Sequence, residues 1–174
     1  AVTGAIGALK GPLHGGVPGP VLEMIEEIGA PDRAEAWVRA ALGRGERIMG
    51  FGHRVYKVRD PRAEVLGRVA EGLSKTTGDR RLLDLIREVE RATVTVLAEA
   101  KPGRDLYANV ELYAALVLHE AGIPPELFTP TFAAARTAGW TAHILEQYAD
   151  NRLIRPQSVY VGARDRTPLS LAAR

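Results

Sequence analysis

The sequence of 174 residues carries 23 Lys and Arg against 21 Asp and Glu, for a formal net charge of +2, and hydrophobic residues make up 46% of it. This composition is typical of a packed globular protein and excludes a largely disordered or collagen-like chain. The basic residues are dispersed along the chain, which argues against a nucleic-acid partner, and the lack of Cys excludes disulfides and thiolate sites.

No stretch of the sequence approaches the roughly 18 apolar residues that a membrane-spanning helix needs, and none has the layout of a signal peptide. We therefore expect a cytoplasmic protein without a membrane partner. Residues 1–11 are small and apolar, and they are typical of the last turns of a buried helix that Gly11 and Pro12 end. Because this helix lacks both an initiator Met and a cap, we expect the chain to be a piece of a longer protein.

Helices are predicted along most of the remaining sequence. A short one over residues 21–29 has a Pro-rich start and a Gly stop. The next is predicted over Asp32 to Leu42, where Asp32 and Glu35 have the spacing of a capping box. Asp60 is expected to cap another helix that begins at Pro61 and ends at about Leu73.

In the second half of the chain, residues 80–98 keep apolar positions at a period near 3.6, which predicts an amphipathic helix. Further helices are predicted over residues 109–121 and from residue 124 to about residue 150, and the last stretch is more irregular. Alternation with period 2 is confined to short pieces such as residues 158–162. The fold class is therefore all-α, although this pattern alone predicts no topology.

Two His residues lie on glycine-rich turns. His14 belongs to a Gly-Pro-Leu-His-Gly-Gly sequence at a helix end, where backbone amides can face a ligand, although an ordinary loop His is an equal interpretation. His53 follows Gly50-Phe51-Gly52 and precedes four cations within ten residues: Arg54, Lys57, Arg59 and Arg62. Free amides and guanidinium groups suit phosphates or carboxylates, and the alternative is a solvated basic helix start.

Two charged residues lie in apolar helical surroundings. Arg136 lies among small residues, where a charge is costly unless a ligand or an acidic partner neutralises it. Glu111 lies among apolar residues that would raise the pKa of its carboxyl, so it is a candidate base, and pairing with an Arg is the alternative. His119 and His143 are expected to serve packing or the surface, and no spacing predicts a metal site.

Five segments taken together resemble signature blocks of citrate synthases, in the order of that family and with similar gaps. They are GPLHGG, GFGHRVYKVRDPR, ANVELYA, FTPTFAAARTAGWTAHILEQ and NRLIRPQSVYVG. The resemblance covers nearly the whole chain. It implies a dimeric, almost wholly helical fold with a large and a small domain, of which the N-terminal part of the large domain is missing here.

The resemblance divides the chain into residues 1–16 at the end of a large-domain segment, a small domain at residues 17–118, and a C-terminal large-domain segment at residues 119–174. It also implies the reaction, which is condensation of acetyl-coenzyme A with oxaloacetate to give citrate and coenzyme A in the tricarboxylic acid cycle. No cofactor and no metal ion are implied, because the coenzyme A thioester is itself a substrate.

Site residues are carried over position by position. His14 matches the His that hydrogen-bonds the thioester carbonyl, and His53 matches the one that polarises the ketone of oxaloacetate. Glu111 matches the general base. The matches to the remaining site residues are Arg62 and Arg136 for carboxylate binding, Arg155 for the partner subunit's site, and Gly50, Phe51, Gly52 and Lys57 for coenzyme A.

Two departures from the family pattern affect the expected site. Most members have Asp where this chain has Glu111, and the extra methylene moves the carboxylate. A shift of about 1 Å in a reacting group can cost on the order of 100-fold in rate. GGVPG replaces the usual GGAN beside His14 and changes that loop.

Three hypotheses remain open besides acetyl transfer by a homodimer. The protein could prefer propionyl-coenzyme A, as 2-methylcitrate synthases do. The 174-residue chain could be a non-catalytic piece that needs a missing N-terminal part, or the Glu111 change could leave only a binding protein for coenzyme A or acidic metabolites.

Overall fold

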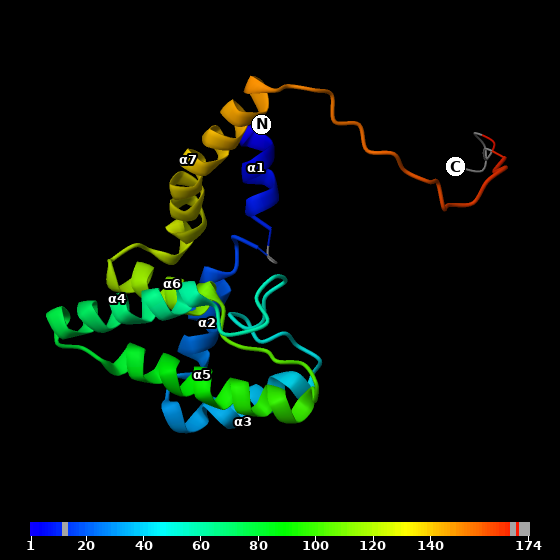
Figure 1. Ribbon diagram of the computed structural model, residues 1–174. Coiled ribbons are helices and arrows are strands. Elements are labelled where there is room, and N and C mark those ends of the chain that lie inside the picture. Colours follow the sequence, from blue (N-terminus) through cyan, green and yellow to red (C-terminus); the bar gives the residue numbers. More distant parts are fainter. Residues whose placement is uncertain (12–13, 168–169, 171–174) are drawn as a thin grey trace.

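The computed structural model describes residues 1–11, 14–167 and 170, and every regular element within them is a helix (Figure 1). In chain order the elements are α1 (Val2–Leu9), α2 (Pro18–Ile28), the 3-10 turn η1 (Pro31–Arg33), α3 (Ala34–Gly43), α4 (Pro61–Thr77), α5 (Arg81–Ala100), α6 (Val110–Glu120), the 3-10 turn η2 (Pro125–Leu127) and α7 (Phe128–Ala149). The all-α prediction is confirmed. The only extended pairing in the described residues is a single bridge between Phe51 and Ala108.

Prolines and capping side chains explain where several helices begin. Pro18 lies in the first turn of α2, and Asp60 caps α4 just before Pro61, as the sequence predicts. Asn109 caps α6 by accepting a hydrogen bond from the N–H of Glu111. α4 extends four residues beyond its predicted end at Leu73, because nothing breaks the helix before Gly78 adopts a left-handed conformation.

The predicted capping box at the start of α3 is wrong. Asp32 lies inside η1, and the residue before α3 is Arg33, whose side chain makes no capping hydrogen bond. Pro31 starts the 3-10 turn early, so Asp32 takes a helical conformation and cannot adopt the extended backbone that an N-cap needs. The predicted end of α1 before Gly11 is confirmed, whereas Pro12 and Leu13 lie outside the described residues.

One hydrophobic core holds α2 to α6 together. α6 is its central helix, since it packs against α2, α4 and α5, while α3 packs along α5 (Figure 1). Among the largest fully buried side chains are Ile25, Ile86, Leu112, Leu116 and Phe128. Phe128 is the first residue of α7, so this helix is anchored in the core at its start and leaves it afterwards.

α1 and α7 pack against each other outside this core, and residues 151–167 follow α7 without helix or strand (Figure 1). The large apolar side chains of this C-terminal segment are exposed: Leu153, Ile154, Val159, Tyr160 and Val161. No helix in the described part of the chain is both long and apolar enough to cross a membrane.

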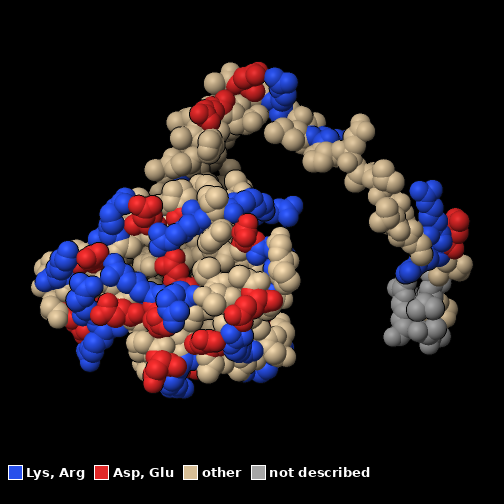
Figure 2. All heavy atoms as spheres, turned by 60° about the horizontal axis from the view of Figure 1, so that its bottom comes forward, with Lys and Arg blue, Asp and Glu red and all other residues tan. Residues whose placement is uncertain are grey.

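Charged side chains of both signs are interspersed on the face of the helical body that Figure 2 shows. Several of them pair between neighbouring helices, as Arg39 of α3 does with Glu99 of α5 at 2.8 Å. Exposed pairs of this kind contribute little to stability, typically below about 1 kcal/mol each. The hydrophobic core around α6 is therefore a larger source of stability in the body than these ion pairs.

Truncating Leu116 of α6 tests this view of the core. We expect Leu116→Ala to lower the free energy of unfolding by about 2–5 kcal/mol, because its fully buried side chain would leave a cavity. Leu145→Ala on α7 is the matched control; this side chain is 68% exposed, and the change should stay within about 0.5 kcal/mol. Urea unfolding followed by circular dichroism measures both, and equal losses would contradict the assignment of α6 to the core.

Candidate active site

The glycine turn that precedes His53 is fixed against the start of α6. The backbone N–H of Asn109 donates to the carbonyl of Gly50 at 2.9 Å, and the Asn109 side chain donates to the carbonyl of Gly52 at 2.9 Å. Both glycines have φ near +80°, and a Cβ on Gly50 would lie 3.1 Å from the Cβ of Leu112. Only glycine suits such a backbone and so close an approach, so this turn delivers His53 to the N-terminus of α6.

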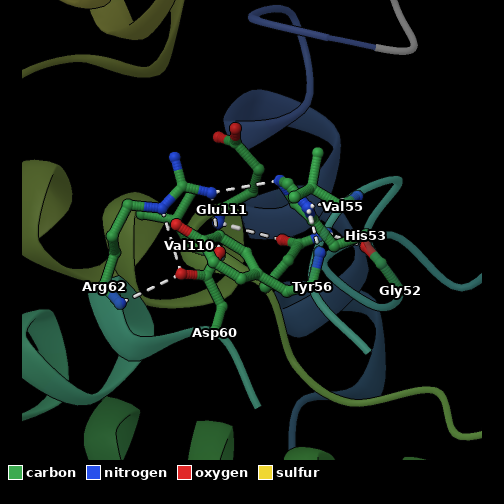
Figure 3. A network of polar contacts seen from close by, with 9 residues as sticks. Gly52, His53, Val55, Tyr56, Asp60, Arg62, Val110 and Glu111 are labelled. Atoms are coloured by element: carbon green, nitrogen blue, oxygen red, sulfur yellow. Dashed lines mark hydrogen bonds and ion pairs between the residues drawn. The ribbon is translucent and has the colours of Figure 1, made fainter. Parts of the chain in front are cut away.

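The hydrogen bonds of His53 define where its proton lies. Its Nδ1 atom accepts from the backbone N–H groups of Val55 and Tyr56, both at 3.1 Å. In a neutral ring the proton is therefore on Nε2, which points at Nη2 of Arg62 across 3.2 Å (Figure 3). Two donors cannot bond each other, so the two N–H groups together suit an oxygen atom of a ligand.

Arg62 is held in place by the buried carboxylate of Asp60. Its Nε and Nη2 atoms donate to Oδ1 and Oδ2 of Asp60 at 3.0 and 2.7 Å, and its own backbone N–H donates to Oδ1 at 3.0 Å. Burial alone would raise the pKa of Asp60, but these bonds and one from the N–H of Val110 outweigh it and lower that pKa. Asp60 thus stays ionised and fixes the guanidinium.

Glu111 extends from the first turn of α6 toward the same region as Arg62 and His53 (Figure 3). Its side chain is buried, and its Oε2 atom has no hydrogen-bond partner among the residues that the structure describes. Burial is the main cause that raises the pKa of this carboxyl, to about 7 once the opposing charge of Arg62, the added effect of Asp60 and the opposing charge of Arg136 are included. The expectation of a raised pKa is confirmed, and the alternative of a hydrogen-bonded Arg partner is not seen.

Arg136 differs from what its sequence context indicates. Its side chain is exposed on α7, stacks on the ring of Phe132 at 5.2 Å, and forms no ion pair within the described ranges. Its charge is therefore solvated and needs no acidic partner, because α7 leaves the core after its first residue. Its positive charge is near enough to lower the pKa of Glu111 slightly, so α7 brings a second cation toward the candidate site.

His14 lies on a separate tight turn between α1 and α2. The turn is packed closely, since a Cβ on Gly15 would lie 2.6 Å from the Cγ of Leu9, and Thr129 of α7 donates to the carbonyl of Gly15 at 3.0 Å. The His14 side chain is exposed, and no described hydrogen bond joins it to His53 or Glu111.

Some of the other predicted residues lie next to this site, and others lie apart from it. Phe51 forms the bridge with Ala108 and so belongs to the site's frame, while Lys57 is exposed and donates to the carbonyl of Arg54 at 3.3 Å. Arg155 is exposed on the C-terminal segment, which extends away from the helical body (Figure 1). Within one chain, the structure brings together His53, Arg62 and Glu111, faced by Arg136, and leaves Arg155 apart.

Sequence reasoning missed two residues that build this site. The sequence predicts only a capping role for Asp60 and a helix boundary at Asn109, yet together these residues position Arg62, the glycine turn and Glu111. The Asp-Pro-Arg sequence could have signalled the first of these. His119 and His143 are exposed, as predicted, and no group of three or more metal-binding side chains occurs in the described part of the chain.

Comparison with known proteins shows which family this chain resembles. Residues 1–157 match the family model described as citrate synthase, C-terminal domain. The chain is 46% identical over 166 residues to the citrate synthase of Haloferax volcanii, covering 95% of this chain and 42% of the relative. It is 49% identical over 161 residues to citrate synthase 2 of Bacillus subtilis, covering 92% of this chain and 41% of the relative.

Solved structures agree with the sequence matches. A crystal structure of citrate synthase from Thermotoga maritima has a TM-score of 0.83 and 44% identity, covering 99% of this chain and 46% of the other. The citrate synthase of Thermoplasma acidophilum, solved as a ternary complex with carboxymethyl coenzyme A and oxaloacetate, has a TM-score of 0.85 and 35% identity over the same shares. The chain thus spans less than half the length of these relatives.

Replacing Glu111 tests its buried, unpaired state. Because its pKa is raised from 4.5 to about 7, the folded protein holds this proton more tightly than the unfolded chain, and stability falls as pH rises between these values. Glu111→Gln has no such proton to lose. We expect it to gain stability relative to the parent, by up to about 3 kcal/mol, as pH rises from about 4 to about 8.

Urea unfolding at a series of pH values measures this difference. Glu88→Gln is the control, because the hydrogen bond from Arg91 lowers the pKa of Glu88 and its ion pair is lost as pH falls. Its stability relative to the parent should therefore move in the opposite direction with pH, though weakly, since the pair is exposed. A Glu111→Gln difference that does not vary with pH would show that Glu111 is ionised in the folded protein as readily as in the unfolded chain.

Proposed function

The chain belongs to the citrate synthase family, and from that premise we propose that its protein condenses acetyl-coenzyme A with oxaloacetate to give citrate and coenzyme A. The observation that carries the proposal is the unpaired, buried carboxyl of Glu111 beside the two converging donors of His53 and Arg62. A candidate base is thus next to two donors that can polarise the ketone of a keto acid. The relative solved with a coenzyme A analogue and oxaloacetate supports this choice of substrates.

Glu111 acts as the base in this proposal. A carboxyl with a pKa of about 7 is half ionised at neutral pH and can take a proton from the methyl group of the acetyl thioester. Loss of that proton leaves the enolate of the thioester, and His14 donates the hydrogen bond that stabilises its oxygen. His14 comes to this role from the family pattern, and its turn contacts α7, the helix that carries Arg136.

Carbon–carbon bond formation follows at the ketone. The Nε2–H of His53 donates to the ketone oxygen of oxaloacetate, which makes the ketone carbon a better electrophile. The enolate carbon attacks it, and the ketone oxygen takes a proton from the Nε2–H of His53 to become the hydroxyl of citryl-coenzyme A. The proton that Glu111 took from the methyl group balances this transfer. Water then cleaves the thioester, which releases citrate and coenzyme A. Arg62 and Arg136 bind the carboxylates of oxaloacetate.

In this proposal the complete site needs residues from a second subunit. The Gly50–Gly52 turn and Lys57 are proposed to hold coenzyme A, and Arg155 is proposed to reach the site of a second subunit in a homodimer. The exposed C-terminal segment, with Arg155 extended away from its own helical body, favours that arrangement. Because the chain also spans less than half of its relatives, we propose that the 174 residues alone turn over little or no substrate.

Thiol release from acetyl-coenzyme A tests the reaction. We expect the protein at its natural length to release free thiol only when oxaloacetate is present, because the enol has no electrophile without it. Parallel assays with propionyl-coenzyme A distinguish the alternative, since a higher kcat/KM with propionyl would assign 2-methylcitrate synthesis. Absence of oxaloacetate-dependent release from both thioesters would contradict the proposal, and steady turnover by the 174 residues alone would contradict their proposed inactivity.

Replacing Arg62 tests its proposed role in substrate binding. We expect Arg62→Gln to raise the KM for oxaloacetate by roughly 10- to 100-fold, because hydrogen bonds to charged groups contribute about 1.5–3 kcal/mol. Arg68→Gln, on the same helix and paired only with exposed Glu64, should leave that KM unchanged. Steady-state kinetics measure both, and an unchanged KM in Arg62→Gln would remove Arg62 from the oxaloacetate site.

A further inference from the structure

Asp60 makes hydrogen bonds to two different helices. It accepts from the backbone N–H and the guanidinium of Arg62 in α4, and its Oδ2 atom accepts from the backbone N–H of Val110 at 3.1 Å. Val110 is the first residue of α6 and directly precedes Glu111. One buried carboxylate therefore joins the N-terminal turns of the two helices that carry Arg62 and Glu111 (Figure 3).

The chain contains a second, nearly identical arrangement that serves as an internal comparison. Asp79 accepts from the backbone N–H of Arg81 at 2.9 Å and from its Nε and Nη2 atoms at 3.1 and 2.6 Å. The Asp79 side chain is 45% exposed and bonds no other helix, whereas Asp60 is 1% exposed. The hydrogen-bond pattern to the Arg two residues on is the same at both places, although Asp60 is the N-cap of α4 and Asp79 lies one residue before the N-cap of α5. This local pattern therefore does not require Asp60 to be buried between α4 and α6.

Burying a carboxylate is costly unless its lone pairs are satisfied, and Asp60 meets this requirement with four hydrogen bonds. The bidentate pair fixes the plane of the Arg62 guanidinium. The outer Nη2 atom is thereby turned to His53, where the two donors converge. The bond to Val110 holds the start of α6 at the same carboxylate, which sets the distance between Arg62 and Glu111.

We propose that Asp60 is a positioning residue of the condensation reaction: it sets Arg62 and the first turn of α6 so that the donors and the carboxyl of Glu111 face one substrate. The inference rests on the proposed function of this site. Asp60 does not contact substrate in this proposal, because its oxygens are already occupied by hydrogen bonds from Arg62 and Val110.

The charge of Asp60 supports the same role. It raises the pKa of Glu111, against the lowering effect of Arg62 and Arg136. His53 and Tyr56, whose ring centroids lie 4.7 Å apart, are further titratable groups drawn with Glu111 in this cluster (Figure 3). Removing the charge of Asp60 leaves burial as the remaining cause that raises this pKa, while Arg62 and Arg136 still lower it, so the pKa of Glu111 should fall.

Asp60→Asn and Asp79→Asn form the matched pair of variants for the test. Asn keeps the shape and the capping ability of Asp but cannot accept both guanidinium N–H groups. In the protein at its natural length, we expect Asp60→Asn to raise the KM for oxaloacetate by about 10-fold or more and to lower kcat. Asp79→Asn should leave both constants within about 2-fold.

The pH profile separates positioning from simple loss of structure. We expect the acidic limb of kcat/KM to move to lower pH in Asp60→Asn and to stay in place in Asp79→Asn, since activity requires ionised Glu111. If Asp60→Asn does not fold, Asp60→Ser replaces it, because Ser caps the helix equally well without binding the guanidinium. An unchanged KM and an unshifted limb in the folded variant would overturn the proposal.

A second measurement keeps this inference distinct from the proposed reaction. If the parent protein shows no condensation activity, the proposed function fails, and the Glu111 carboxyl is then titrated by carbon NMR in ¹³C-labelled protein without substrate. A lower Glu111 pKa in the Asp60 variant than in Asp79→Asn supports the positioning role of Asp60, and equal values overturn it.

Discussion

The structure depends on how the N-terminus of α6 is held. α6 is the central helix of the core, so its first N–H groups must find partners away from bulk water. Asn109 and Asp60 provide them, by accepting from Glu111 and Val110. Each of these two side chains also bonds a second element, Asn109 the glycine turn and Asp60 the start of α4. Satisfying the end of one buried helix therefore assembles most of the candidate site.

This assembly has an electrostatic consequence. The start of α6 is buried by its neighbours, so the carboxyl of Glu111 loses solvation and its pKa rises despite two nearby guanidinium groups. Asp60 is buried as well but has the opposite shift, because its oxygens are satisfied by Arg62 and Val110. Of two carboxyls in one region, the paired one is fixed and ionised, and the unpaired one is free to exchange a proton. A catalytic base needs a carboxyl that can exchange a proton, and a neighbouring carboxylate that stays ionised can hold the surrounding groups in place.

The remaining parts of the chain are organised differently. α1 and α7 pack together outside the core, and the C-terminal segment exposes a run of apolar side chains such as Leu153 and Val161. His14 and Arg155 lie on these outer parts, whereas His53, Arg62 and Glu111 lie on the core. Most of the predicted site residues therefore lie on the helical body, whereas His14, Arg136 and Arg155 lie on α7 and the outer segments.

The sequence by itself determined the all-α fold, nearly all helix positions and the family, because helical periodicity, caps, prolines and local motifs are properties of neighbouring residues. It also predicted the raised pKa of Glu111 from apolar neighbours. Only the tertiary structure decided that Asp60 joins α4 to α6, 50 residues apart, and that Arg136 is solvated and not buried. The capping box at Asp32 failed for a local reason, since Pro31 began a 3-10 turn there. Contacts between distant residues depend on how helices pack, and no spacing along one chain specifies that.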